Sequence, residues 1–262
     1  MPARWNDLFD RNLMDAIREF GRWQDRTLIM EEDGVLLVSG GTEFPIGFSN
    51  CVARTDPDTD PALVIERAEE FFRAQGRGFT VWVRDHVDAD IEAYLQQRGA
   101  RSTGQSPWML LTKRPLPTVV PEGAEVRITS DAADLEVIHS IIIEAFGQTG
   151  TPREEADSLF AHPRRVFSPV TRFALATIDG EPAATAMALL TGGMGGIYWV
   201  GTRPKFARRG LGTACTVAVA NAAFELGKPM VGLHSTPMGQ AVYERLGFER
   251  TRANGHRWYV LT

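Results

Sequence analysis

The residues best suited to chemistry lie in one short stretch, residues 208–213 (RRGLGT), at the start of a long apolar helical segment. The first turn of a helix has four backbone N–H groups without internal partners, and the helix dipole adds partial positive charge there. Gly210 and Gly212 lack a side chain, so an anion can approach the backbone closely. Arg208 and Arg209 add fixed charge. We therefore predict a site for a phosphate or pyrophosphate group.

Spacing distinguishes between the known kinds of phosphate-binding loop. A dinucleotide-binding fingerprint would need a third glycine at Cys215, and a P-loop would need Gly-Lys followed by Ser or Thr. Neither pattern is present in residues 208–213. The RRGLG sequence instead follows an expected strand that ends in Thr-Arg-Pro. This arrangement resembles the acetyl-CoA pyrophosphate loop of the GCN5-related N-acetyltransferase (GNAT) superfamily. An Arg-rich helix cap with glycines for a tight turn is the alternative interpretation.

The resemblance covers the whole second half of the chain and implies a set of contacts with acetyl-CoA, the expected co-substrate. In GNAT proteins the pantetheine arm pairs with the strand before the loop like an added strand. By position, Val200 would contact the thioester carbonyl and Thr202 the pantetheine, while Thr236 stands where many relatives have a pantetheine-binding Asn. Each charge-assisted hydrogen bond from the loop amides would contribute about 1.5–3 kcal/mol. The implied contact residues are Val200, Gly201, Thr202, Arg208, Arg209, Gly210, Leu211, Gly212, Thr213 and Thr236.

The catalytic residues that the resemblance implies are fewer. Acyl transfer to an amine needs a proton for the departing thiolate, and Tyr243 matches the tyrosine that many relatives use as this general acid. A tyrosine that only packs in the core is the alternative. The strand 192–202, from which several relatives take their general base, contains no Asp, Glu or His. Glu144 and His139 are candidates that would act through water, with a solvated Glu and a half-buried His as the alternatives. We interpret His234 as structural.

The elements that must position these residues alternate between strands and helices. In the first half we expect a helix within 5–23, an antiparallel meander over 26–54, helices at 62–75 and 89–98, and strands at 79–84 and 108–112. In the second half we expect strands at 125–129, 172–178, 182–190, 195–202 and 230–234, helices from 135 and over 152–161, 208–227 and 238–246, and closing strands over 248–261. The order in the second half is that of a complete GNAT domain.

A proline-rich segment and an internal repeat both divide the chain in two. Residues 113–123 contain three prolines, as expected for an extended linker, and we place a domain boundary there. PWMLLT at 107–112 echoes RWYVLT at 257–262 at an offset of about one domain. We therefore predict an α+β (mixed α/β) fold of two tandem GNAT-like domains, 1–117 and 118–262, each a mixed, mostly antiparallel sheet flanked by helices. Unrelated α+β packing of the first half with a chance echo is the alternative.

The first half is expected not to bind the cofactor. Where the second half has its phosphate loop, the first half has TDPDTDP at 55–61, with three carboxylates and no glycine. Such a loop would repel pyrophosphate. We interpret residues 1–117 as a degenerate copy and residues 118–262 as the catalytic copy.

Composition excludes several classes of function. The chain has 262 residues, of which 44% are apolar, and a formal net charge of −5, so we expect no nucleic-acid partner. Two cysteines are too few for a disulfide framework and wrongly spaced for zinc, so we expect no metal site. No apolar run approaches the length of a membrane span or follows the pattern of a signal peptide. We expect a cytoplasmic protein that is a monomer or a homodimer.

The resemblance implies direct acetyl transfer from acetyl-CoA to a primary amine, for which we expect a small-molecule acceptor and a ternary complex. One alternative is a non-catalytic sensor or docking protein that binds CoA or acyl-CoA. Another is transfer of a longer acyl group, for which Gly192, Gly193, Gly195 and Gly196 would make room. Residues 147–160 are the candidate lid over the acceptor, with an ordinary helix-loop-helix as the alternative.

Overall fold

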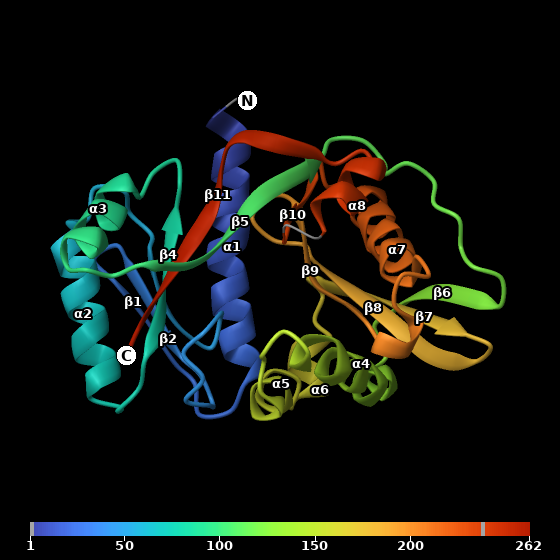
Figure 1. The fold of residues 1–262 in the computed structure, drawn as a ribbon, viewed down its shortest axis with the longest axis horizontal. Helices are drawn as coiled ribbons and strands as arrows, with labels where there is room; N and C mark the ends of the chain where they lie inside the picture. The colour runs from blue at the N-terminus through green and yellow to red at the C-terminus, as the bar shows by residue number, and fades with distance from the viewer. Residues whose placement is uncertain (1–2, 237–238) are drawn as a thin grey trace.

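The computed structural model describes residues 3–236 and 239–262, and Figure 1 shows its fold. Within these residues, the strands form one continuous 11-stranded sheet in the order β1-β2-β3-β4-β11-β5-β10-β9-β8-β7-β6. Neighbouring strands are antiparallel except for the pairs β3–β4 and β9–β10, which are parallel. The predicted mixed α/β class with a mostly antiparallel sheet is confirmed.

The first half of the chain contributes one edge of the sheet. It consists of α1 (Ala3–Trp23), β1 (Leu28–Glu32), β2 (Val35–Ser39), β3 (Asn50–Arg54), α2 (Pro61–Arg73), β4 (Phe79–Arg84), α3 (Ala89–Gln97) and β5 (Ser102–Leu111). The predicted antiparallel meander corresponds to β1–β3. Strand β5 begins before the expected residue 108. Its first part is polar, with exposed Ser102 and Thr103, and the sequence therefore shows no apolar pattern that would have predicted a strand there.

The second half contributes the other edge. It consists of β6 (Ala124–Thr129), α4 (Leu135–Gly147), α5 (Arg153–Leu159), α6 (Pro163–Val166), β7 (Thr171–Ile178), β8 (Glu181–Leu189), β9 (Gly195–Thr202), α7 (Leu211–Glu225), β10 (Val231–His234), α8 (Gln240–Arg245) and β11 (Glu249–Leu261), with short 3-10 turns at Ala132–Asp134 and Pro204–Phe206. One strand, β11, replaces the expected closing strands over 248–261. The expected helix start at Met238 lies outside the described residues.

Two strands are exchanged between the halves. Strand β5 of the first half pairs with β10 of the second, while β11 of the second half pairs with β4 of the first, and β5 and β11 pair with each other. Figure 1 shows both strands crossing the middle of the molecule. The boundary at residues 117 and 118 stays a prediction about folding units, and a cut there would remove one sheet strand from each half.

The exchanged strands lie in equivalent positions, which agrees with the repeat in the sequence. Each half contains a parallel strand–helix–strand unit, β3-α2-β4 and β9-α7-β10, followed by a further helix and a long strand. In the β4–β11 pair Trp82 lies opposite Trp258, and in the β10–β5 pair His234 lies opposite Trp108. The two halves therefore meet around a pseudo-symmetric centre that is rich in aromatic rings.

Helix α1 of the first half packs against the strands of the second. The Asn12 side-chain amide donates to the carbonyl oxygens of Leu189 and Thr191, at 3.2 Å each, and the Tyr198 hydroxyl donates to Asn12 Oδ1 at 2.9 Å. A Cβ on Gly196 would lie 1.9 Å from Asn12 Oδ1, and one on Gly192 would lie 2.6 Å from the Asn12 backbone nitrogen. Because Gly192 and Gly196 have no side chain, α1 can pack closely against this part of the second half.

The expectation that residues 192–196 make room for a longer acyl group is corrected accordingly. Besides the contacts of Gly192 and Gly196 with Asn12, a Cβ on Gly193 would lie 3.1 Å from Leu8, and one on Gly195 would lie 2.8 Å from Ala223. The space beside each of these glycines is taken by another part of the chain. Nothing in this cluster favours a long acyl donor.

Candidate active site

The predicted phosphate loop lies directly before α7, which begins at Leu211. Gly210 is the N-cap residue and has a left-handed backbone with φ +81°, a conformation that glycine adopts without strain. Among the residues that the structure describes, no side chain caps this helix start, so none of their hydroxyls or carboxylates satisfies its first amides. The exposed Arg208 and Arg209 stand beside them. The loop has the features of an anion-binding helix start.

A cavity of about 280 Å³, here called the loop groove, brings most of the predicted cofactor residues together. Gly212 explains how strand and helix come close, because a Cβ there would lie 2.8 Å from Thr202 Oγ1 on β9. Of the predicted set, the groove is lined by Val200, Thr202, Arg208, Gly210, Leu211, Gly212 and Thr213. Gly201 instead faces α4, where a Cβ would meet Ala145 at 3.1 Å. Arg209 does not line the cavity.

Strand β9 carries the backbone edge on which a pantetheine arm could pair. β9 and β10 pair only over residues 195–197 and 231–233, and within the described residues the rest of β9 has no strand partner on that side. A β-bulge lies on the other side of β9, where the β8–β9 register shifts between the pairs Met187–Tyr198 and Thr185–Gly201. Trp199 in the bulge has φ +52°, a value uncommon for a residue with a side chain.

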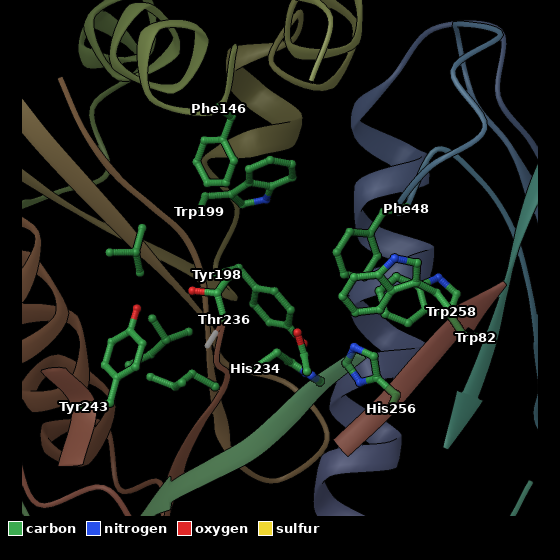
Figure 2. Close-up of a pocket in the computed structure, with 14 residues that line it drawn as sticks. Phe48, Trp82, Phe146, Tyr198, Trp199, His234, Thr236, Tyr243, His256 and Trp258 are labelled. Atoms are coloured by element: carbon green, nitrogen blue, oxygen red, sulfur yellow. The ribbon is translucent and has the colours of Figure 1, made fainter. Parts of the chain in front are cut away.

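A second cavity, of about 300 Å³, opens where β9 and β10 diverge, and we call it the aromatic pocket. Figure 2 shows its wall, to which both halves of the chain contribute rings. Phe48 and Trp82 come from the first half, while Phe146, Tyr198 and Trp199 come from the second. Trp258 stands on the exchanged strand β11. The strand exchange therefore builds this pocket.

Tyr243 on α8 lies between the two cavities. It lines both the loop groove and the aromatic pocket, as does Val200. Burial raises the pKa of Tyr243 to about 12, so the phenol keeps its proton at neutral pH. Its ring packs on Phe248 with centroids 5.7 Å apart. The predicted general acid is thus placed where a groove for a phosphate-bearing molecule meets a pocket for a second one.

Comparison with known proteins identifies the second half. Residues 113–234 match the family model described as an acetyltransferase (GNAT) domain. These residues are therefore similar to a GNAT acetyltransferase domain. No curated protein matches the sequence. That family transfers acetyl groups from acyl-CoA, and the match supports acyl-CoA-dependent acetyl transfer in general.

Solved structures share the fold over almost the whole chain. A GCN5-related N-acetyltransferase from Kribbella flavida has 19% identity and a TM-score of 0.71, with 94% of this chain and 92% of that chain covered. One from Sphaerobacter thermophilus has 17% identity and a TM-score of 0.64, with 95% and 84% covered. A tandem GNAT protein from the clavulanic acid biosynthesis pathway has 14% identity and a TM-score of 0.61, with 91% and 84% covered. The tandem architecture is therefore found in solved relatives of the same fold.

Two histidines line the aromatic pocket. The rings of His234 and His256 have centroids 4.3 Å apart. Trp108 donates its indole N–H to Nδ1 of His256 at 3.1 Å, so the neutral imidazole carries its own proton on Nε2. Burial lowers the pKa of His234 to about 3, and burial together with His234 lowers the pKa of His256 well below its ordinary value. His234, expected to be structural, also lines the pocket.

The other candidates for a base lie outside the aromatic pocket. Glu144 is half exposed and forms an ion pair with Arg203 at 2.6 Å, while Arg203 also donates to Ser140. His139 packs on Phe160 and lies 3.0 Å from Asp157, and burial lowers its pKa. Neither Glu144 nor His139 lines either cavity. Thr236 lines the aromatic pocket, and its hydroxyl accepts from the amide of Gly239 at 3.2 Å before α8.

The candidate lid is tied to the first half of the chain. Within it, Glu155 is buried, and its carboxylate accepts hydrogen bonds from the hydroxyls of Thr42 and Ser49. Burial raises the pKa of Glu155. Helix α5 therefore packs against the loop that carries Phe48, next to the aromatic pocket. A lid function stays a prediction.

The first half has no comparable anion site at the equivalent helix. The Asp60 carboxylate accepts from the amide of Ala62 at 2.7 Å, and Pro61 occupies the first turn of α2 without an N–H group. The chain's own carboxylate thus takes the position that an anion takes at an uncapped helix start. That the first copy does not bind a phosphate group stays a prediction.

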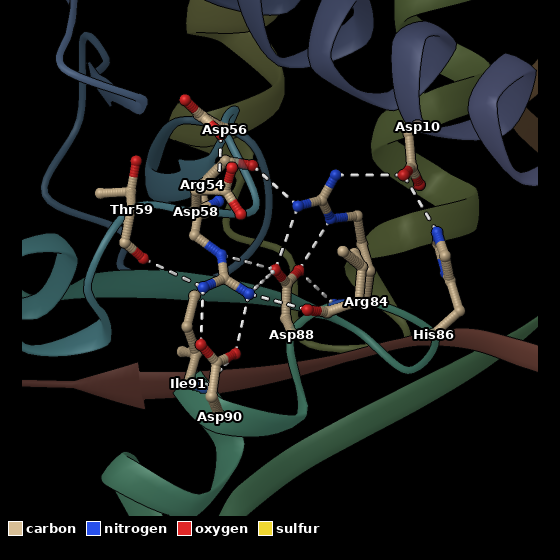
Figure 3. A network of polar contacts seen from close by, with 11 residues as sticks. Asp10, Arg54, Asp56, Asp58, Thr59, Arg84, His86, Asp88, Asp90 and Ile91 are labelled. Atoms are coloured by element: carbon tan, nitrogen blue, oxygen red, sulfur yellow. Dashed lines mark hydrogen bonds and ion pairs between the residues drawn. The ribbon is translucent and has the colours of Figure 1, made fainter.

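The ends of the equivalent strands β3 and β4 are also filled, as Figure 3 shows. Arg54 ends β3 and Arg84 ends β4, and both bind the fully buried Asp88, through Nε at 3.0 Å and 2.7 Å respectively. Arg54 also donates a bidentate pair of hydrogen bonds to the Asp90 carboxylate, and Arg84 donates a hydrogen bond to Asp10. Where the second half opens a groove, the first half holds a polar network.

Among the described residues no helix is both long and apolar enough to cross a bilayer. In the same part of the chain no three His, Cys, Asp or Glu side chains gather as metal ligands. Both cysteines are free and buried, and burial raises the pKa of each thiol to about 12.

Proposed function

We propose that this chain transfers the acetyl group of acetyl-CoA directly to the primary amine of a small molecule, within a ternary complex. The observation that carries the proposal is the shared wall of the two cavities, because Val200 and Tyr243 line both the loop groove and the aromatic pocket. A donor in one and an acceptor in the other would meet at Tyr243. The uncapped amides before α7 supply the anion site for the pyrophosphate.

The residues of the chain then have defined tasks. The free edge of β9 beside Val200 would align the pantetheine arm, and the thioester supplies an activated acetyl carbon when bound. The described lining of the aromatic pocket contains no carboxylate to pair with an ammonium ion, so loss of water there favours the neutral, nucleophilic form of the amine. This removes the need for the strong base that strand β9 lacks.

Tyr243 balances the protons of the transfer. As the C–N bond forms and the C–S bond breaks, the phenol would donate its proton to the departing sulfur. The attacking nitrogen then returns one proton to the phenolate, directly or through water. The products are an acetamide and the free CoA thiol, and Tyr243 ends as it began.

The first experiment tests the loop with a matched pair of variants in the full chain. Gly210→Asp places a carboxylate at the expected pyrophosphate site, whereas Gly227→Asp places one at the opposite end of the same helix. Both glycines have a left-handed backbone, with φ +81° and +77°, and a Cβ would meet no close contact at either position. Calorimetry should find at least about tenfold weaker acetyl-CoA binding for Gly210→Asp and unchanged binding for Gly227→Asp. Equal affinity in both variants would refute the proposed site.

The second experiment separates an enzyme from a sensor. Tyr243→Phe keeps the ring on Phe248 and removes the hydroxyl, so acetyl-CoA affinity should persist. The rate of thiol release with an accepted amine should fall about 10²-fold or more. An unchanged rate would remove Tyr243 from the mechanism. Tight acetyl-CoA binding by the unmodified chain without thiol release across a broad panel of amines would instead favour the sensor.

A further inference from the structure

The wall of the aromatic pocket carries no fixed charge. Among the described residues that line it, there is no Asp, Glu, Lys or Arg, and both histidines are neutral because burial lowers their pKa values. Its polar groups are the hydroxyls and imidazoles of Ser106, Tyr198, His234, Thr236, Tyr243 and His256, together with the indole N–H groups of Trp82, Trp199 and Trp258. An ionised group that entered this pocket would lose its hydration without gaining a counter-charge.

That loss decides between classes of amine. Moving an unpaired carboxylate, phosphate or second ammonium out of water costs several kcal/mol even after the surroundings relax. Amino acids, phosphorylated amino sugars and polyamines all carry such a group at neutral pH. The pocket therefore disfavours them relative to an amine whose remaining skeleton is uncharged.

The shape of the pocket favours a flat ligand. Phe48 and Trp82 lie with ring centroids 4.9 Å apart and planes 31° from parallel, and Trp258 packs beside Trp82 at 5.9 Å. These rings support one another and present apolar faces, against which an aromatic ring can stack. A volume of about 300 Å³ is at the small end of ligand pockets. One aromatic ring and a short chain suit this volume.

The positions of the polar groups give the ligand a direction. In Figure 2, Tyr243 lies on one side of the pocket and His256, Trp82 and Trp258 lie on the other. The side of Tyr243 adjoins the loop groove, so the amine must point there and the rest of the ligand must extend toward Trp258. His256 is held by Trp108 as the Nε2–H tautomer, a neutral donor suited to a hydroxyl group rather than to an anion.

From these observations we infer that the acceptor is an arylalkyl primary amine without a second charged group, its ring seated against Phe48, Trp82 and Trp258. The inference rests on the proposed acetyl transfer and specifies its substrate class. It also gives the first half of the chain a direct task, because Phe48 and Trp82 belong to that half. A ring hydroxyl directed at His256 is compatible with this seat.

A panel of matched amines tests the inference. The pairs 2-phenylethylamine with phenylalanine, and tyramine with tyrosine, differ only by a carboxylate, while putrescine and spermidine carry a second cation without a ring. We expect kcat/KM for each arylalkylamine to exceed that of its carboxylate partner, and of both polyamines, by at least about 100-fold. Equal or better acetylation of phenylalanine, tyrosine or spermidine would overturn the inference.

Variants in the wall test the seat of the ring. Phe48→Leu keeps an apolar side chain of similar size but removes the aromatic face, and Trp258→Phe keeps a smaller aromatic face. For 2-phenylethylamine we expect KM to rise at least about fivefold in Phe48→Leu and less in Trp258→Phe, with unchanged acetyl-CoA affinity in both. An unchanged KM in Phe48→Leu would contradict the proposed seat.

The two proposals fail in different ways. If acetyl-CoA does not bind, or if no amine releases thiol, the proposed function fails. If acetyl-CoA binds and the chain acetylates charged amines as well as arylalkylamines, only the substrate class fails. Circular dichroism of each variant confirms that the fold is retained before either conclusion is drawn.

Discussion

The imidazole of His234 lies 4.3 Å from that of His256, centroid to centroid, although strand β5 separates the strands that carry them. Each ring stands opposite a residue of β5, His234 opposite Trp108 and His256 opposite Ser106. Two imidazolium ions at this distance, away from water, would repel each other strongly. The fold therefore requires both histidines to be neutral.

This pair should make the protein less stable as the pH falls below about 6.5. In the unfolded chain each histidine titrates near pH 6.5, whereas in the folded chain the pKa of His234 is about 3 and that of His256 is also far lowered. Below about pH 6.5 the unfolded state therefore binds more protons. The free energy of unfolding should fall by about 1.4 kcal/mol per pH unit for each histidine. Urea denaturation across this pH range measures the slope.

Substitution of either histidine should remove its share of that slope. His256→Gln keeps a polar side chain next to Trp108 but cannot bind a proton in this range. The difference between the slopes of the variant and the unmodified chain cancels the contribution of carboxylates elsewhere, including the buried Glu155. A difference near zero would mean that His256 is protonated in the folded chain.

Gly212→Ala should destabilise the loop through one identified contact. The added Cβ would lie 2.8 Å from Thr202 Oγ1, so either the Thr202 side chain must change rotamer or β9 and α7 must separate, at a cost of about 1–3 kcal/mol. Thr202→Ala removes the opposing atom and should restore part of this stability in the double variant, whereas Thr202→Ser keeps Oγ1 and should not. A double-mutant cycle from thermal denaturation gives the coupling energy. Additive effects of Gly212→Ala and Thr202→Ala would contradict this explanation.

Gly196→Ala should release α1 from the sheet of the second half. The added Cβ would lie 1.9 Å from Asn12 Oδ1, the atom that accepts the Tyr198 hydroxyl. Overpacking and the loss of a buried hydrogen bond should together cost about 2–4 kcal/mol in unfolding free energy. Gly147→Ala is the matched control, since a Cβ at the end of α4 meets nothing within 4 Å. Equal stability of the two variants would show that α1 does not depend on this contact.

The sequence predicts the loop of the site better than its pocket. The phosphate loop is predicted from the spacing of Gly210, Gly212 and the flanking arginines, because its shape is set by the local backbone. The structure places this loop at the expected start of a helix. The strands expected at 172–178 and 182–190 also depend on local patterns, and they are found as the antiparallel pair β7 and β8. Local patterns of this kind need no knowledge of the tertiary fold.

The aromatic pocket could not be predicted in the same way. Phe48, Trp82 and Trp258 lie far apart in the sequence and come together only because β11 inserts between β4 and β5. The repeat of PWMLLT in RWYVLT was the available signal, but a repeat does not tell whether its strands pair within a half or across halves. The polar start of β5 and the close packing of α1 on residues 192–196 could not be predicted either, because both depend on contacts between distant parts of the chain.

The polar network of the first half gives the last prediction. Asp88 and Asp90 both bind Arg54, but Asp88 is fully buried between two buried arginines, whereas the side chain of Asp90 is 49% exposed. Asp88→Asn keeps the size of the side chain and leaves the guanidinium groups of Arg54 and Arg84 without their shared counter-charge, which should cost about 3–5 kcal/mol. Asp90→Asn should cost about 1 kcal/mol or less, because water screens an exposed pair.

Chemical denaturation of the two variants side by side measures this difference. If the network replaces the ligand that the first half has lost, Asp88→Asn should loosen the ends of β3 and β4 and increase amide exchange there, while acetyl-CoA affinity at the loop of the second half stays unchanged. Equal stability of the Asp88 and Asp90 variants would mean that the buried charge is compensated by the hydrogen bonds that Arg54 donates to the carbonyl oxygens of Thr59 and Val87. The arginines would then be held mainly by the backbone, and the filled cleft would not depend on Asp88.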